Sequence, residues 1–399
     1  MGGHDAQGIR RAEMTMKSII VFVAVVGGVF SPVIVSHLLW RFEPVLHLNL
    51  KVVDYSVPDE TYRNHTGLFW LLNYLRIQAP AVGGPWLVNR DYIGFDPAGK
   101  GRGITLSQTS LAQTDWIYLA DTYGVHITDR RARPGQQVTN GFIFGGLTLS
   151  DAATLTAFTD RGGSIISEFN SLADPTPQEA RRILSTILGV RQTGWVGRFV
   201  SDISTLPRQH AWFTDLYRRA FGKRPIPAGP GMMLLHEDGR LVLLSGAPFE
   251  QSMPTLALTE EGREWMTTPV GTPPYYGWFG ICAPDDGTEV LAELLLPKLN
   301  GWKKSLSESG VPLRFPAVTR KQTGSSIRYA LAADISVLEE VPNFYGLAFL
   351  PRMLAAVNRR RDSRRNEPTF WQFFVPVVGK MLTDAANDSR AEGGESNDD

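Results

Sequence analysis

The alternation of hydrophobic and polar positions is clearest over residues 115–189, where short apolar runs are separated by longer amphipathic segments. Trp116–Ala120 and Ser164–Ser167 are short, bounded by polar or turn residues and partly β-branched, which is typical of buried strands. A third apolar run, Phe142–Phe144, ends in two glycines. The pattern therefore predicts three strands in this part of the chain, with helices between and after them.

The best-defined predicted helix covers residues 177–188. Thr176 is placed as its N-cap, Pro177 occupies the first helical position, Glu179 completes a capping box and Gly189 provides the C-terminal stop. Four apolar residues at helical spacing form one face: Ile183, Leu184, Ile187 and Leu188. Strands that alternate with helices of this length favour a parallel sheet with helices on both faces.

Further strands are expected on either side of this unit. Leu48–Val57 predicts a first strand, and residues 232–236 and 241–245 flank an Asp-Gly turn, which favours a β-hairpin. Residues 278–282, 311–318 and 327–333 predict more strands, the last ending at Asp334, and 289–299 predicts a helix. The predicted fold class is α/β, a mostly parallel doubly wound sheet with a β-hairpin addition, preceded by one N-terminal transmembrane helix.

The transmembrane prediction rests on residues 18–40, which contain no Asp, Glu, Lys or Arg. About 20 apolar residues in a helix span a bilayer core, and no cleavage site of the A-x-A type follows the segment. The basic residues before it favour a cytoplasmic N-terminus. The expected location is therefore the inner (plasma) membrane of a bacterial envelope, with a single pass and most of the chain extracytoplasmic.

The C-terminal region combines a basic cluster with an apolar segment. Five arginines crowd residues 359–365, and 370–382 is strongly apolar and aromatic but too short to span a bilayer. Two alternatives follow for 370–382: a helix that lies in the lipid interface, or a core helix docked on the sheet. Residues 383–399 are acidic and rich in small polar residues, which predicts a disordered tail.

Composition narrows the functional classes. The 399 residues hold 40 basic and 40 acidic side chains, so no net charge favours nucleic acid as a partner. The single cysteine, Cys282, excludes an intrachain disulfide framework and a Cys-rich metal site. The expected partners are the lipid bilayer and an envelope glycan or membrane protein.

Candidate chemistry comes from the rule that open parallel sheets bind ligands at the carboxyl ends of their strands. Asp54, Asp121 and Glu168 each follow or end a predicted strand, so the three carboxylates are expected to converge. Crowded carboxylates raise one another's pKa, which suits general acid–base work or a divalent cation, although no cofactor is predicted. The alternative is that each acid caps the turn that follows it.

Five residues follow these strand ends closely enough to line the same crevice and are the candidate ligand-binding residues: Tyr123, His126, Asn170, Trp195 and Arg198. The chain lacks the motifs of several common site types, namely GxSxG, HExxH, CxxC and the EF-hand loop. The candidate catalytic residues are thus limited to the three carboxylates.

The order of strand, Gly145-Gly146-Leu147-Thr148 turn, helix and the strand segment RGGSIISEFN (161–170) resembles the class I glutamine amidotransferase-like superfamily. The resemblance implies a flavodoxin-like sheet. Working amidotransferases also carry a cysteine on a strand-to-helix elbow and a downstream His-x-Glu pair. Here Cys282 comes after the hairpin, and His236 is directly followed by Glu237. The resemblance therefore implies a degenerate, non-catalytic member without glutaminase activity.

These inferences give one leading function and two alternatives. The first is a membrane-anchored envelope protein whose amidotransferase-like domain binds a ligand or partner, such as a glycan. The second is a hydrolase that uses Asp54, Asp121 and Glu168, and the third is a structural subunit docked through 359–382. The predicted segments are a polar flank (1–17), the transmembrane helix (18–40), the α/β domain (42–245), an aromatic and Pro-rich extension completing it (246–345), a basic linker with the apolar helix (346–382) and the tail (383–399).

Overall fold

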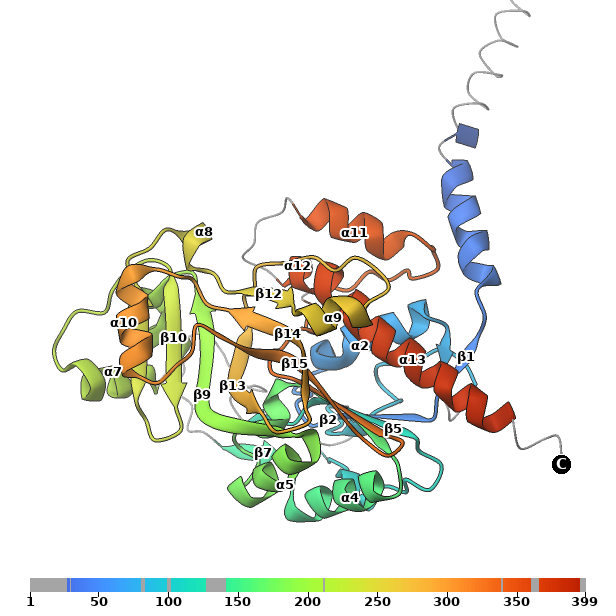
Figure 1. Ribbon diagram of the computed structural model, residues 1–399, viewed down its shortest axis with the longest axis horizontal. Helices are drawn as coiled ribbons and strands as arrows, with labels where there is room; N and C mark the ends of the chain where they lie inside the picture. Colours follow the sequence, from blue (N-terminus) through green and yellow to red (C-terminus); the bar gives the residue numbers. More distant parts are fainter. Residues whose placement is uncertain are drawn as a thin grey trace, which may run out of the picture.

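The computed structural model describes residues 27–28, 30–79, 83–98, 102–126, 141–210, 212–338, 340–359 and 366–394. Two sheets dominate it, one of eight strands and one of four (Figure 1). The eight-stranded sheet has the order β12-β14-β15-β16-β8-β5-β2-β4. Its strands are β2 (Leu50–Asp54), β4 (Ile93–Gly94), β5 (Trp116–Asp121), β8 (Ser164–Ser167), β12 (Thr255–Leu258), β14 (Glu289–Leu295), β15 (Arg314–Thr323) and β16 (Ser326–Leu331).

The large sheet is mixed, which corrects the prediction of a mostly parallel sheet. Strands β4, β2, β5, β8 and β16 pair in parallel, whereas β16-β15, β15-β14 and β14-β12 pair antiparallel. The direction reverses because β15 and β16 are joined by a tight turn in which Gly324 adopts a φ of +60°. Residues 289–295 form β14 in place of the predicted helix. The alternation of strands and helices over residues 50–188 agrees with the prediction.

The four-stranded sheet has the order β11-β10-β9-β13 and is antiparallel throughout. The predicted hairpin, β10 (Gly231–His236) with β11 (Leu241–Ser245), belongs to this second sheet. The long strand β9 (Val190–Val200) and β13 (Trp278–Pro284) complete it. The backbone N–H of Asp334 donates to the Trp278 carbonyl at 3.1 Å, so the segment after β16 runs along the start of β13. This contact brings the second sheet to the carboxyl edge of the first.

Helices cover both faces of the large sheet. On one face α4 (Leu149–Asp160) and α5 (Gln178–Leu188) pack on inward side chains such as Ile117 and Leu119. On the other face α2 (Arg63–Tyr74) and α13 (Val375–Gly394) pack on Tyr118 and its neighbours. Alternate residues of β5 thus point to opposite faces, as the period of a strand requires. The predicted N-cap of α5 is one residue early, because Thr176 is buried and accepts a hydrogen bond from the Leu147 N–H at 3.1 Å.

The remaining elements are short. They are β1 (Leu46–His47), β3 (Ile77–Gln78), β6 (Val125–His126), β7 (Phe142–Phe144), α6 (Leu206–Gln209), α7 (Phe213–Phe221), α8 (Phe249–Ser252), α9 (Glu260–Trp265), α10 (Asn300–Glu308), α11 (Leu350–Asn358) and α12 (Glu367–Thr369), with a π-helical turn over Phe370–Phe374.

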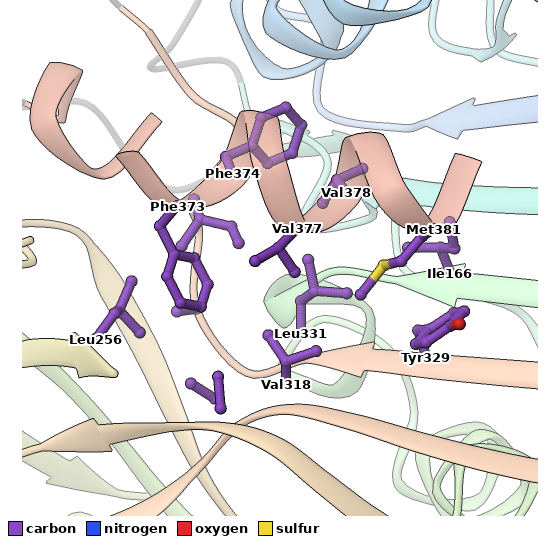
Figure 2. Close-up of a cluster of buried hydrophobic side chains, with 14 of the residues drawn as sticks. Ile166, Leu256, Val318, Tyr329, Leu331, Phe373, Phe374, Val377, Val378 and Met381 are labelled. Atoms are coloured by element: carbon purple, nitrogen blue, oxygen red, sulfur yellow. The ribbon is translucent and has the colours of Figure 1, made fainter. Parts of the chain in front are cut away.

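The segment 370–382 is a core helix, which decides between its two alternatives. Figure 2 shows Phe373 pointing toward Leu256, and Val377 toward Leu331 of the large sheet. Seven of its side chains are fully buried: Phe370, Phe373, Phe374, Val377, Val378, Met381 and Leu382. The helix continues to Gly394, so the acidic residues 383–394 are helical and not a disordered tail. Buried Ala385 and Ala386 extend the apolar face that holds this part in place.

The predicted transmembrane helix is wrong by the same structural criterion on which it was based. Among the residues that the structure describes, no helix is both long enough and apolar enough to cross a bilayer. The helical residues described in this region are 27–28 and 30–42. Residues 18–26 and 29 of the predicted span lie outside the described residues. The prediction of a membrane-spanning, single-pass topology, which rested on that helix, is therefore wrong as well.

Candidate site at the carboxyl edge of the large sheet

Four neighbouring parallel strands end in an acid at the same edge of the sheet. Asp54 ends β2, Asp121 ends β5, Glu168 follows β8 and Asp334 follows β16. The strand order β16-β8-β5-β2 places them in one row, and Asp54 and Asp121 are partners in the register. Because neighbouring strands lie about 4.8 Å apart, each carboxyl group has another close to it. The predicted convergence of Asp54, Asp121 and Glu168 is found, and Asp334 joins them.

Asp54 is fully buried and bonded on both oxygens. Oδ1 accepts the Ser56 N–H at 2.9 Å, and Oδ2 lies 2.6 Å from Nδ1 of His65. The other ring nitrogen of His65 lies 2.8 Å from the Val88 carbonyl, which can only accept, so Nε2 carries a proton. Asp54 therefore holds the turn after β2 and fixes α2 against the sheet.

Asp121 is also bonded within the protein, although 8% of its surface remains exposed. Its Oδ1 accepts the Ser56 hydroxyl at 2.6 Å and the Tyr123 N–H at 2.7 Å, and Oδ2 accepts the Asn170 amide at 2.7 Å. Burial, and then the charge of Asp54, raise the pKa of Asp121 to about 6, against these hydrogen bonds. Asp54 and Asp121 each cap the turn that follows their strand, as the turn-capping alternative predicted. They also lie next to each other at the same edge of the sheet.

Glu168 is buried between two hydroxyl groups. Tyr118 donates to Oε1 at 2.7 Å and Ser336 donates to Oε2 at 2.9 Å. Burial and the nearby charge of Asp334 raise the pKa of Glu168 well above its ordinary value. Glu168 therefore ties the β5 and β8 strands to the segment after β16, and its oxygens are occupied by protein donors.

Asp334 differs from the other three acids. It is half-buried, and no side-chain or backbone donor among the described residues hydrogen-bonds to its carboxylate. Burial and then the charge of Asp121 raise the pKa of Asp334 to about 7, while Arg63 and Arg198 lower it. The prediction of site residues missed Asp334, although the predicted strand 327–333 ended at it. Its strand pairs in parallel with β8 only because the β15–β16 hairpin turns it back, and this pairing is not visible in the local pattern.

The structure separates the five predicted ligand-binding residues. Asn170 and the backbone of Tyr123 bond to Asp121, and the Tyr123 ring is 47% exposed and 5.2 Å from the ring of His126. Arg198 lies near Asp334, whose pKa it lowers. Trp195 does not join them, because its ring is buried and packs against His236 at 4.9 Å.

Arg198 stacks on one ring, Trp278, which begins a chain of aromatic contacts that the sequence did not associate with it. Its guanidinium carbon lies 5.7 Å from the centroid of Trp278, its cross-strand partner in β13. His210, at the end of α6, lies 6.4 Å from Trp278 and stacks on Trp212 at 5.2 Å. We call Arg198, His210, Trp212 and Trp278 the Arg198 cluster.

Two further features named in the sequence analysis, Cys282 and His236, lie in the second sheet. Cys282 lies in β13, and burial raises the pKa of its thiol to about 12, so the thiolate is scarcely populated at neutral pH. His236 ends β10, as predicted, and lies 2.8 Å from Asp238. Within the described ranges, no group of three or more His, Cys, Asp or Glu side chains is arranged to hold a metal ion.

The comparisons with known proteins do not assign a family. No protein-family model matches the chain, and no curated protein matches it. Among solved structures, a β-galactosidase from Bacillus circulans is 12% identical with a TM-score of 0.33, over 78% of this chain and 31% of that one. The carbohydrate deacetylase Agd3 is 10% identical with a TM-score of 0.33, over 73% and 30%. A ThuA-like protein from Bacteroides uniformis is 11% identical with a TM-score of 0.31, over 80% and 95%.

The chain thus spans about a third of the length of the β-galactosidase and of the deacetylase. TM-scores this low do not establish a shared fold. The resemblance to class I glutamine amidotransferases stays a prediction.

Proposed function

We propose that the carboxyl edge of the large sheet is a binding site for a hydroxyl-rich ligand such as a carbohydrate. The observation that carries the proposal is the contrast among the charged groups. Asp54, Asp121 and Glu168 are occupied by protein donors, whereas the side chains of Asp334 and Arg198 are half-buried and have no hydrogen-bond partner among the described residues.

Half-buried charged groups need hydrogen-bond partners from water or from a ligand, because leaving them unsatisfied is costly. A polyol supplies hydroxyl groups that donate to the Asp334 carboxylate and accept from the Arg198 guanidinium. The exposed ring of Trp212, 38% accessible, offers an apolar face for a sugar ring.

Isothermal titration of the full chain with a panel of neutral and acidic mono- and oligosaccharides tests the proposal. We expect saturable binding that Asp334→Ala weakens at least tenfold, because a charge-assisted hydrogen bond is lost. Asp286→Ala, which removes an exposed carboxylate elsewhere, is the matched control and should leave binding unchanged. Binding that survives Asp334→Ala unaltered, or no binding to any saccharide, contradicts the proposal.

A hydrolase is the second candidate, and the pKa of about 7 at Asp334 favours it. A carboxyl group that titrates near neutral pH suits a general acid. The three predicted catalytic carboxylates are buried and bonded, so in this candidate Asp334 takes the role of the acid. Release of reducing sugar from oligosaccharides, whose leaving group needs protonation, by the full chain, abolished in Asp334→Asn, would support hydrolysis over binding. The third alternative, docking through 359–382, loses its basis over 370–382, whose apolar side chains are buried in the core.

A further inference from the structure

Arg198 combines a fixed position with unused hydrogen-bond donors. It lies in the middle strand β9, opposite Trp278 on one side and Met233 on the other. A guanidinium that stacks on an indole ring keeps its N–H groups available at its edge. Among the residues that the structure describes, nothing accepts a hydrogen bond from the guanidinium of Arg198 or pairs with its charge at ion-pair distance.

A second arginine, Arg240 in the turn between β10 and β11, shows what an occupied guanidinium looks like. The guanidinium carbon of Arg240 lies 5.1 Å from the ring centroid of Trp195, a stacking geometry similar to that of Arg198 on Trp278. Its Nε, however, donates to Oδ2 of Asp238 at 2.8 Å. Arg240 therefore has a carboxylate partner within the protein, and Arg198 lacks the equivalent partner.

His210 is a third group with an unused polar atom at this place. Its Nε2 is buried and has no hydrogen-bond partner. Burial and then the charge of Arg198 lower the pKa of His210, which keeps the ring neutral near pH 7. A neutral imidazole offers one donor and one acceptor. Its ring stacks on Trp212, which is 38% exposed.

Asp334 and Arg198, which both contact Trp278, require different ligand chemistry. Asp334, whose N–H bonds to the Trp278 carbonyl, needs a hydroxyl donor, and Arg198, stacked on the Trp278 ring, needs an acceptor. A neutral sugar would satisfy the hydrogen bonds of Arg198 but would leave its half-buried charge unmatched. A carboxylate matches both, because its two oxygens fit the guanidinium fork.

Resting on the proposed function, we propose that the ligand is an acidic sugar of the hexuronate type. Its ring hydroxyl groups bond to Asp334, its carboxylate pairs with Arg198, and its apolar ring face packs on Trp212. The ring nitrogen of His210 accepts or donates one further hydrogen bond to the same residue of the saccharide. The Arg198 cluster is then the part of the site that selects for negative charge.

The test compares three ligands on the unmodified full chain: methyl glucuronoside, the methyl ester of that glucuronoside, and methyl glucoside. The ester keeps the ring hydroxyl groups and removes only the charge. We expect the acid to bind about tenfold more tightly than either neutral ligand, as a charge-assisted bidentate contact implies. Because the contact is ionic, 0.5 M salt should weaken binding of the acid more than that of the ester.

Variants then assign the preference to a residue. Arg198→Met should bring the three affinities to within about twofold of one another, and Arg198→Lys should retain part of the preference. Arg240→Met is the matched control and should keep the full preference. Equal affinity of the unmodified chain for the acid and its ester overturns the acidic-sugar inference and leaves carbohydrate binding standing. A preference that persists in Arg198→Met overturns the assignment to Arg198. Absence of binding by all three ligands and by the saccharide panel overturns the proposed function itself.

Discussion

Nδ1 of His65 lies 2.6 Å from Oδ2 of Asp54, and neither side chain has any exposed surface. His65 comes from α2 and Asp54 from β2, so this one contact fixes the helix to the carboxyl edge of the sheet. Removing one partner of a buried pair leaves the other without compensation, which typically costs about 3–5 kcal/mol. We expect His65→Phe, which keeps a ring against Phe69 and Tyr92, to lower the free energy of unfolding by about that amount.

Urea denaturation of the full chain measures the loss. His47→Phe, at an exposed position in β1, is the control and should change the free energy of unfolding by less than about 0.5 kcal/mol. A loss below about 1 kcal/mol in His65→Phe would show that Asp54 tolerates burial without its partner.

The pKa of Asp334 gives a pH dependence with a defined sign. Its value in the folded chain, about 7, lies above the ordinary 3.8, so the folded state holds a proton that the unfolded state releases. This proton favours folding below about pH 4, and its contribution is lost as the pH rises from 4 to 7. Asp121, raised to about 6, acts in the same direction over a narrower range. Stability should therefore fall between pH 4 and pH 7.

Asp334→Asn removes the ionisable group, so the stability of this variant should fall less as the pH rises toward 7. Because Asp334 is half-buried, we discount the full linkage value to about 1–2 kcal/mol of extra stability at pH 8, with no difference at pH 4. Denaturation midpoints of the two proteins across pH 4–8 measure it. The denaturation midpoints of the control Asp286→Asn should change with pH as those of the unmodified chain do. The same pH dependence in Asp334→Asn would refute the pKa shift.

The carboxylates predicted from the sequence are those at the ends of strands that can be recognised from the local sequence pattern. Asp54, Asp121 and Glu168 follow apolar runs whose length and β-branching identify them as buried strands. Asp334 follows such a run as well, but strand β16 reaches the row only by pairing with β8. Tyr329 pairs with Ile166, which lies 163 residues earlier in the chain, and no local pattern reports a pairing over that distance. The register of strands that lie far apart in the sequence is set by tertiary packing. This is why the sequence analysis did not include Asp334 among the site residues.

The wrong transmembrane prediction and the choice left open at 370–382 have a common physical cause. A helix that is apolar on most of its surface has the same composition whether it lies in a core or in lipid. For 370–382 the structure decides for the core, and for the described part of 18–40 it provides no helix that meets the requirements of a span.

Residues 289–295 are rich in good helix formers yet form β14, because pairing with β12 and β15 overrides their propensity.

Packing of α2 behind the site leads to a prediction about two helical glycines. A Cβ built on Gly67 would lie 2.3 Å from the Ser336 carbonyl oxygen and 2.7 Å from the Phe370 ring. Ser336 also donates to Glu168, so an added methyl group would displace the segment that carries Asp334 and Ser336. Gly67→Ala should lower the free energy of unfolding by about 1–3 kcal/mol, the usual cost of overpacking, despite the better helix propensity of alanine.

Gly301 in α10 is the matched control, because a Cβ there would meet no atom within 4 Å. With no steric cost, Gly301→Ala should raise the free energy of unfolding by about 0.5–1 kcal/mol through helix propensity alone. Urea denaturation measures the free energy of unfolding of both variants, which should decrease in Gly67→Ala and increase in Gly301→Ala. If Gly67→Ala were as stabilising as Gly301→Ala, then α2 would not be pressed against Ser336 and Phe370, and the close packing that holds Asp334 at the edge of the sheet would be refuted.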